Sequence, residues 1–308
     1  MRVFQHIDAL WGRFWPLLAL PPLVLAGYVV TGQARIEHYV VILGVIVFSV
    51  ASRLTRDLLL AVIPGIGIFL GYEAVRGLRP LFVTPDRVLA CQFRDLDAAL
   101  FGFGTGMTPA DFFALHHSPL ADLIFALPYT VFWAVVMAYC GVLFLISRGR
   151  LRRYLWVLAL THLVAFAIWM ALPAAPPWYV RTVGCGIDTA VPPQAAALSR
   201  LDARFGIGYF EAFYSRAPTV FGAFPSLHVS FPAAAMVTGW RWFGPLGRTV
   251  TATLTLWMIA ASVYLDHHWL VDGLATLVIV VALHALLVRL WPAYRTPAPR
   301  TVWREGPR

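Results

Sequence analysis

Lysine is absent from this chain of 308 residues, and acidic residues are few: 15 aspartates and glutamates accompany 24 arginines, for a formal net charge of +9. Charged residues make up only 13% of the chain, whereas 60% is hydrophobic and the mean hydropathy is +0.73. A soluble domain of this composition would expose too much apolar surface. The arginines do not form a basic face interleaved with aromatic residues, so no nucleic-acid partner is expected. The composition predicts an integral membrane protein.

Cysteine is also scarce, with three residues and no CxxC pair or Cys/His spacing typical of a metal site. Cys140 falls in an apolar run and is interpreted as a small core residue. Cys91 and Cys185 fall outside the apolar runs; the sequence favours two free thiols but leaves a disulfide open. We expect neither a metal nor a cofactor. No small-residue cleavage pattern follows the first apolar run, so we expect it to be retained as a membrane span.

Long apolar runs dominate what the sequence does contain. A helix needs about 20 mostly apolar residues to cross a bilayer, and about eight runs qualify. We therefore expect an all-α, polytopic membrane helical bundle, in which the sixth span is short and contains Pro232. The expected spans are residues 14–31, 37–52, 57–75, 121–147, 153–173, 225–241, 247–265 and 270–290.

The distribution of arginine predicts the orientation. With the N-terminus inside, fifteen of the 24 arginines fall on inner segments, and the run Arg148–Arg153 forms a strongly basic loop between two spans. The expected location is a bacterial inner membrane with both termini cytoplasmic. Residues 76–120 and 174–223 then form a cap on the outer, periplasmic side, where Trp178 and Tyr179 suit the lipid headgroup layer.

Two polar motifs border apolar runs. In the first, Phe224–His228, Pro225 and Ser226 indicate a helix start with Ser226 as a possible N-cap. Free backbone N–H groups at such a start attract phosphate, and His228 lies in the first turn. The simpler alternative is a proline-initiated span with an interfacial histidine.

In the second motif, His268 and Asp272 are four residues apart, so on a helix they share one face. The simpler alternative is a satisfied polar pair at a helix start. Together, however, the two motifs supply two imidazoles and a carboxylate beside hydrocarbon, where ionisable groups are expensive and usually functional. These side chains suit nucleophilic attack on phosphorus and proton transfer to a leaving oxygen. Asp266 and His267 are either supporting residues or loop, and His162 is expected to be hydrogen-bonded within the bundle.

Cations are needed to bind a phosphoryl group. Arg76 and Arg79, at the end of the third span, are the first candidates, and Arg216 is the next. For each, the alternative is an interfacial arginine that contacts lipid headgroups. Glu73 is expected to pair with Arg76 or Arg79.

Five stretches of the chain resemble the type 2 phosphatidate phosphatase superfamily, and within it the inositol phosphorylceramide synthase branch. They are Ala175–Tyr179, Leu198–Asp202, Phe205–Gly206, Ala217–His228 and Tyr264–Asp272. The resemblance covers residues 120–290. It implies a six-helix core, formed by spans three to eight, and divides the chain into N-terminal membrane helices (1–55), a catalytic core (56–290) and a cytoplasmic tail (291–308).

The resemblance also implies a phosphohistidine mechanism without metal. His268 resembles the nucleophile and Asp272 its orienting partner, His228 the acid and base, and Ser226 a group that holds phosphoryl oxygens. The superfamily pattern has Lys where this chain has Tyr72, and Ser-Arg where it has Ala261-Ser262. The branch resembles this chain in lacking that arginine.

The leading hypothesis is a phosphotransferase that moves a phosphorylated head group, with phosphoinositol as one candidate, from a membrane phospholipid to a lipid alcohol such as ceramide. The alternative is a lipid phosphate or polyprenyl pyrophosphate phosphatase that uses water as acceptor. A transporter or channel is a third hypothesis, disfavoured because the two halves of the chain show no matching broken helices. The sequence does not give the head group, the acceptor or the oligomeric state.

Overall fold

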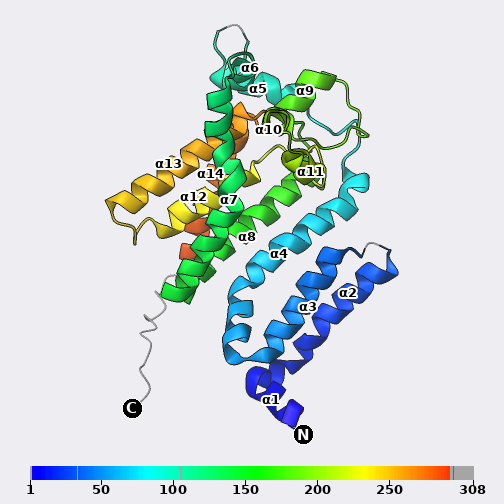
Figure 1. Cartoon of the computed structure of the whole chain (residues 1–308), viewed down its shortest axis with the longest axis vertical. Helices are drawn as coiled ribbons and strands as arrows, with labels where there is room; N and C mark the ends of the chain where they lie inside the picture. Colours follow the sequence, from blue (N-terminus) through cyan, green and yellow to red (C-terminus); the bar gives the residue numbers. More distant parts are fainter. Residues whose placement is uncertain (1, 33, 105, 292–293, 295–308) are drawn as a thin grey trace. The chain divides into compact units, whose positions relative to one another are not determined.

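The computed structural model describes residues 2–32, 34–104, 106–291 and 294. The described chain is helical and contains no strand, apart from isolated bridges that join Ala174 to Leu89 and to Gly222. The expected all-α bundle is confirmed (Figure 1). Of the predicted tail 291–308, all but Trp291 and Tyr294 lies outside the described residues.

The chain divides into two compact units, residues 1–63 and 64–308. The first contains α1 (Arg2–Trp11), the 3-10 helix η1 (Gly12–Ala19), α2 (Leu20–Val30), α3 (Ile36–Ala51) and the start of α4 (Arg53–Phe82). Within it, the Trp11 indole donates to the Ser49 carbonyl at 2.8 Å, and the rings of Tyr28 and His38 stack at 4.0 Å. The expected first span, residues 14–31, corresponds to η1 and α2 together.

The second unit holds a bundle of five helices besides the end of α4. They are α7 (Pro119–Ile146), α8 (Arg148–Ala171), α12 (Leu227–Gly239), α13 (Pro245–Tyr264) and α14 (Leu270–Leu290). Each of the eight expected spans corresponds to a helix or, for the first, a composite of two. Among the described residues, six helical segments are long and apolar enough to cross a bilayer, whereas α3 and α12 are shorter.

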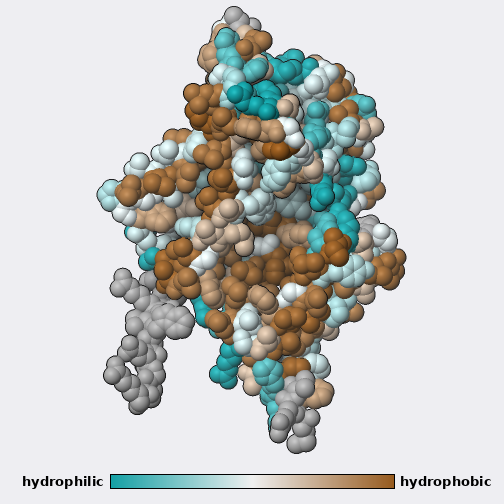
Figure 2. All heavy atoms as spheres, in the orientation of Figure 1, coloured by the Kyte–Doolittle hydropathy of each residue, from teal (hydrophilic) through white to brown (hydrophobic). Residues whose placement is uncertain are grey.

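The short helix α12 packs against α8, α13 and α14. It contains no Asp, Glu, Lys or Arg. Ala233 and Ala234 are fully buried, and their small side chains let the neighbouring helices approach. In contrast, α7 exposes large apolar residues such as Leu127 and Met137. Figure 2 shows apolar side chains on the face of the bundle that is in view, as expected for a surface that meets lipid.

Short helices gather at one end of this bundle (Figure 1). They are α5 (Cys91–Phe101), α6 (Pro109–Leu115), α9 (Pro177–Val183), η2 (Ala196–Leu198), α10 (Ser199–Phe205) and α11 (Tyr209–Tyr214). We call them, with their connections, the cap. Cys91 and Cys185 form a disulfide within it, so the expectation of two free thiols is wrong.

The aromatic residues Trp178 and Tyr179 belong to the core of the cap rather than to a headgroup layer. Their exposed fractions are 6% and 0%, and the Tyr179 ring packs edge-on against Phe221. The sequence prediction is wrong because an aromatic pair at the end of a span suits either environment.

The basic run Arg148–Arg153 is the first turn and a half of α8, not a loop. Only Ser147, whose side chain accepts from the Arg150 N–H at 3.4 Å, separates α7 from α8. The guanidinium groups of Arg150 and Arg153 lie over the Trp242 ring at 4.7 and 4.9 Å. The arginines therefore lie at the end of the bundle where α12 gives way to α13.

Candidate active site

The first motif places His228 at the second position of α12. Ser226 occupies the N-cap position as expected, but its side chain makes no capping hydrogen bond. The fully buried Ser226 hydroxyl instead has no hydrogen-bond partner. The backbone of Ser226 is held by α14, because its N–H donates to the Asp272 carbonyl at 3.3 Å and its carbonyl accepts from the Thr276 hydroxyl at 2.9 Å.

The second motif differs from the prediction in one respect: His268 is not on a helix. It lies in the five-residue linker between α13 and α14, and only Asp272 is helical. The carboxylate caps α14 by accepting from the Trp269 N–H at 2.9 Å, and this brings its Oδ2 to 3.5 Å from His268 Nδ1. The Ala223 carbonyl lies closer to Nδ1, at 2.8 Å.

The two histidines meet although they are 40 residues apart in sequence. His228 Nδ1 lies 3.4 Å from His268 Nε2. Because carbonyl oxygen can only accept, the Ala223 contact requires the proton of a neutral His268 on Nδ1. The lone pair of His268 therefore lies on Nε2 and faces His228. The structure thus brings together the two histidines that the sequence analysis named, and their catalytic roles remain a prediction.

Aromatic rings surround this pair. Tyr129 of α7 stacks on His228 at 4.3 Å, and Tyr214 of α11 stacks on His267 at 4.5 Å. The Tyr214 hydroxyl lies 3.4 Å from His228 Nε2. Burial, with His268 nearby, lowers the pKa of His267 to about 3 against an opposing hydrogen bond with the Ala195 backbone. His267 is thus neutral at physiological pH.

Sequence reasoning missed Tyr129 and Tyr214. Tyr129 looks like any aromatic residue within a span, and Tyr214 lies in a cap helix of six residues without a motif. No local signal in the sequence distinguishes them, because their contacts with histidines are tertiary.

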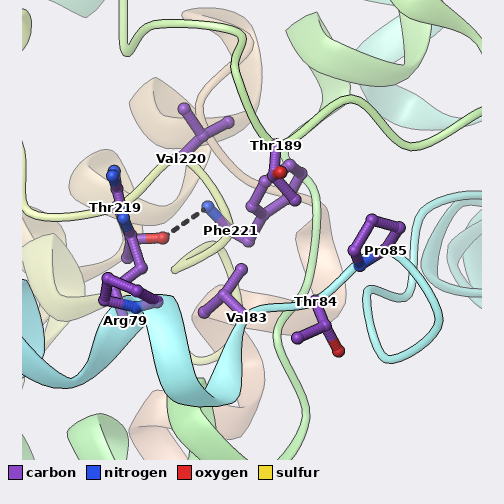
Figure 3. Close-up of a pocket in the computed structure, with 9 residues that line it drawn as sticks. Arg79, Val83, Thr84, Pro85, Thr189, Thr219, Val220 and Phe221 are labelled. Carbon is purple, nitrogen blue, oxygen red and sulfur yellow. Dashed lines mark hydrogen bonds between the residues drawn. The ribbon is translucent and has the colours of Figure 1, made fainter.

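Two of the three predicted arginines, Arg76 and Arg79, lie beside residues 216–221, and the third, Arg216, begins that segment. Arg76 Nη2 donates to the Arg216 carbonyl at 2.9 Å, and Arg76 also pairs with Glu73 at 3.8 Å, as expected. Arg79 lines a cavity of about 310 Å³ together with Thr84, Thr189 and Thr219 (Figure 3). This segment continues directly into Ala223 and Ser226, and so ends at the histidines.

Asp266 has a structural role in the cap. It pairs with Arg181 of α9 at 2.8 Å, and Arg181 pairs with Asp111 of α6 at the same distance. Burial raises the pKa of Asp266, although the Arg181 guanidinium opposes this shift. Burial alone would lower the pKa of Arg181. The carboxylates of Asp266 and Asp111 raise that pKa by more, so the net shift is upward. His162 is buried and hydrogen-bonded to the Leu158 carbonyl at 2.9 Å, as predicted.

Comparison with known proteins identifies the region that carries this site. A family model described as the PAP2 superfamily matches residues 95–286. The phosphoinositol dihydroceramide synthase of Bacteroides thetaiotaomicron is 30% identical over 251 residues, which are 78% of this chain and 80% of that protein. No solved structure matches the chain.

Fungal proteins match over a shorter region. The inositol phosphorylceramide synthase catalytic subunit of Schizosaccharomyces pombe is 36% identical over 42% of this chain and 31% of its own length. The inositol phosphorylceramide synthase of Candida albicans is 30% identical over 49% of this chain and 32% of its own length. The chain thus spans about a third of these fungal relatives.

Proposed function

The chain belongs to the PAP2 superfamily and is a membrane-embedded lipid phosphotransferase, and we propose that it moves phosphoinositol from a glycerophospholipid to a ceramide-type lipid alcohol. The observation that carries this proposal is the contact between His228 Nδ1 and His268 Nε2 at 3.4 Å, inside the region that matches the family. The names of the relatives support the choice of head group and acceptor.

In the first half-reaction, His268 Nε2 attacks the phosphorus of the donor lipid. A nitrogen–phosphorus bond forms, the bond from phosphorus to the diacylglycerol oxygen breaks, and protonated His228 gives its Nδ1 proton to that oxygen. In the second, neutral His228 takes the proton of the acceptor hydroxyl, whose oxygen attacks phosphorus. The nitrogen–phosphorus bond then breaks, which restores His268. Asp272 and the Ala223 carbonyl hold the imidazole of His268 in position.

The start of α12 is the proposed site for the transferred phosphoryl oxygens. The backbone N–H groups there carry partial positive charge, and the buried Ser226 hydroxyl is available as a donor. Asp272 offers only acceptors, so it orients the histidine and does not bind phosphate. We therefore assign phosphate binding to Ser226 and the helix start, with charge supplied by Arg76, Arg79 and Arg216.

The Arg79 cavity is the proposed site of the head group. Its wall at Thr219 and Phe221 belongs to the segment that reaches Ala223 two residues later, and Ala223 contacts His268. A lining that includes one arginine and three threonines suits a phosphorylated polyol, which offers negative charge and many hydroxyl groups. The volume of about 310 Å³ lies at the lower end of typical small-molecule sites.

The reaction is proposed to occur on the periplasmic side, with both termini cytoplasmic. The Cys91–Cys185 disulfide supports this orientation because disulfides persist in oxidising compartments. The arginines at the start of α8 support it from the opposite end of the bundle.

Purified protein with phosphatidylinositol labelled in the inositol ring tests the proposal. With ceramide present, we expect label in a new lipid, and activity that EDTA does not change. Release of labelled inositol phosphate without a lipid product would instead support hydrolysis, the second reaction that the same histidines could perform. A requirement for added metal would contradict the mechanism.

A further inference from the structure

Tyr214 contacts the ring nitrogen of His228 that the proposed reaction leaves unused. Nδ1 of His228 faces His268, while Nε2, on the other side of the ring, lies 3.4 Å from the Tyr214 hydroxyl. Tyr214 is the last residue of α11 and comes from the cap, whereas His228 belongs to the bundle. The acid and base of the reaction is therefore held from both sides.

The hydrogen bonds run in one direction when both histidines are neutral. His268 donates from Nδ1 to the Ala223 carbonyl, so its Nε2 accepts from Nδ1 of His228. Nε2 of His228 then carries a lone pair, and the Tyr214 hydroxyl donates to it. When His228 is protonated, both of its nitrogens are donors, and the same hydroxyl accepts from Nε2. A hydroxyl serves both states by rotating its O–H bond.

The Tyr214 ring is fixed independently of this hydrogen bond. It stacks on His267 at 4.5 Å, and the His267 ring lies 5.6 Å from Tyr129 and nearly parallel to it. Burial raises the pKa of Tyr214, with Tyr209 of its own helix and Tyr72 of α4 adding to the shift. The Tyr214 side chain contacts His228 and His267, and the phenol keeps its proton.

We propose that Tyr214 is a positioning residue that keeps Nδ1 of His228 directed at the reacting oxygen in both protonation states. In the first half-reaction, the Nδ1 proton moves to the leaving alkoxide while the Tyr214 oxygen accepts from Nε2–H. In the second, the acceptor hydroxyl gives its proton to Nδ1, and the contact at Nε2 is unchanged. This inference rests on the proposed acid–base role of His228, not on the identity of the acceptor.

A comparison of two donors tests the inference. Tyr214→Phe keeps the stacked ring and removes only the hydroxyl. With phosphatidylinositol, whose leaving alkoxide needs a proton, we expect labelling of His268 to slow by about 10- to 100-fold, with KM changed less than about threefold. With a nitrophenyl ester of inositol phosphate, whose phenolate leaves without protonation, we expect a loss below about threefold.

Tyr209→Phe is the matched control, because it removes a hydroxyl from the exposed start of the same helix. We expect it to react like the wild type with both donors. Equal losses for the two donors in Tyr214→Phe, or no loss with phosphatidylinositol, would overturn the inference. If the wild type labels His268 but passes the group only to water, the proposed transfer to ceramide fails while the comparison of donors still decides the role of Tyr214.

Discussion

The Ser226 hydroxyl and Oδ1 of Asp272 are buried oxygen atoms without a hydrogen-bond partner, and each belongs to one of the two motifs that carry the histidines. At the residue scale, such an atom costs about 1–3 kcal/mol when it stays unsatisfied. A fold can retain such a cost at a functional site. These two atoms are therefore where substitutions should separate activity from stability.

Ser226→Ala tests the first atom. Because the hydroxyl makes no hydrogen bond within the protein, we expect an unchanged or higher melting temperature and a fall in kcat of about 10-fold or more, as for a lost donor to a charged group. Ser230→Ala is the control, since the Ser230 hydroxyl donates to the Leu227 carbonyl at 2.6 Å. It should lose stability rather than activity. Full activity in Ser226→Ala would contradict the assignment of phosphate binding.

Asp272→Asn tests the second residue. The variant keeps one carbonyl oxygen but loses the charge beside His268, so we expect kcat to fall on the order of 10²-fold, whereas His268→Gln should abolish turnover. His228→Gln should be severely impaired. Asp266→Asn is the control, because the Asp266 carboxylate forms an ion pair with Arg181 and not with His268. Labelled transfer from phosphatidylinositol measures each rate, and normal turnover in His268→Gln would exclude the phosphohistidine.

The depressed pKa of His267 predicts a loss of stability in acid. In the folded protein this histidine titrates near 3, whereas an unfolded histidine titrates near 6.5. As the pH falls below 6.5, the unfolded state binds a proton that the folded state does not, so stability decreases. The contribution at pH 5 is about 2 kcal/mol.

His267→Phe, which keeps the stacked ring, should therefore lose less thermal stability than the wild type between pH 7 and pH 5. Melting temperatures in detergent measure the difference. His117→Phe, at an exposed histidine, should follow the wild type. Identical acid dependence in His267→Phe and the wild type would show that this side chain does not control it.

At the scale of elements, the start of α14 is held by α5. The fully buried Asp97 accepts from the Val271 N–H at 2.9 Å, and Phe93 packs against Phe224 at 4.9 Å. The first residue of α5 is Cys91, whose disulfide to Cys185 joins positions 94 residues apart. The disulfide therefore stabilises a helix that contacts both catalytic motifs.

Replacing Cys91 and Cys185 together by serine should lower the free energy of unfolding by about 2–4 kcal/mol and reduce activity with it. A reducing agent should have the same effect on the wild type and no further effect on the double variant. Cys140→Ala removes the free thiol and serves as the control. If reduction leaves both the melting temperature and the rate unchanged, α5 does not depend on the disulfide.

The helices could be predicted from the sequence, but several of their contacts could not. Apolar runs indicate spans because lipid requires them, and the motifs at 226–228 and 268–272 identified the histidines. The linker position of His268 was missed because an i,i+4 spacing fits a helix and a capped helix start equally well. The disulfide joins positions 94 residues apart, and Tyr214 and His228 lie on different helices, so no local pattern encodes either contact.

At the scale of the whole molecule, the cap and the start of α8 lie at opposite ends of the bundle in the second unit (Figure 1). We expect cysteine introduced at the exposed Phe205 of α10 to react with a membrane-impermeant maleimide in intact cells. Cysteine at the exposed Leu246, where α13 begins, should react only after the membrane is opened. The reverse pattern would place the histidines on the cytoplasmic side.

The five-residue linker that carries His268 also limits how such enzymes can diversify. His268 is held next to α12 by the contacts of its Nδ1 with the Ala223 carbonyl and the Asp272 carboxylate. An insertion or deletion in the linker would therefore displace His268 from His228. The cap is fixed to the same motifs, since Asp97 of α5 contacts Val271 and Tyr214 of α11 contacts His228. Exchanges of cap segments between relatives, made to seek new lipid specificities, should therefore keep these contacts and leave the hairpin of α13 and α14 intact.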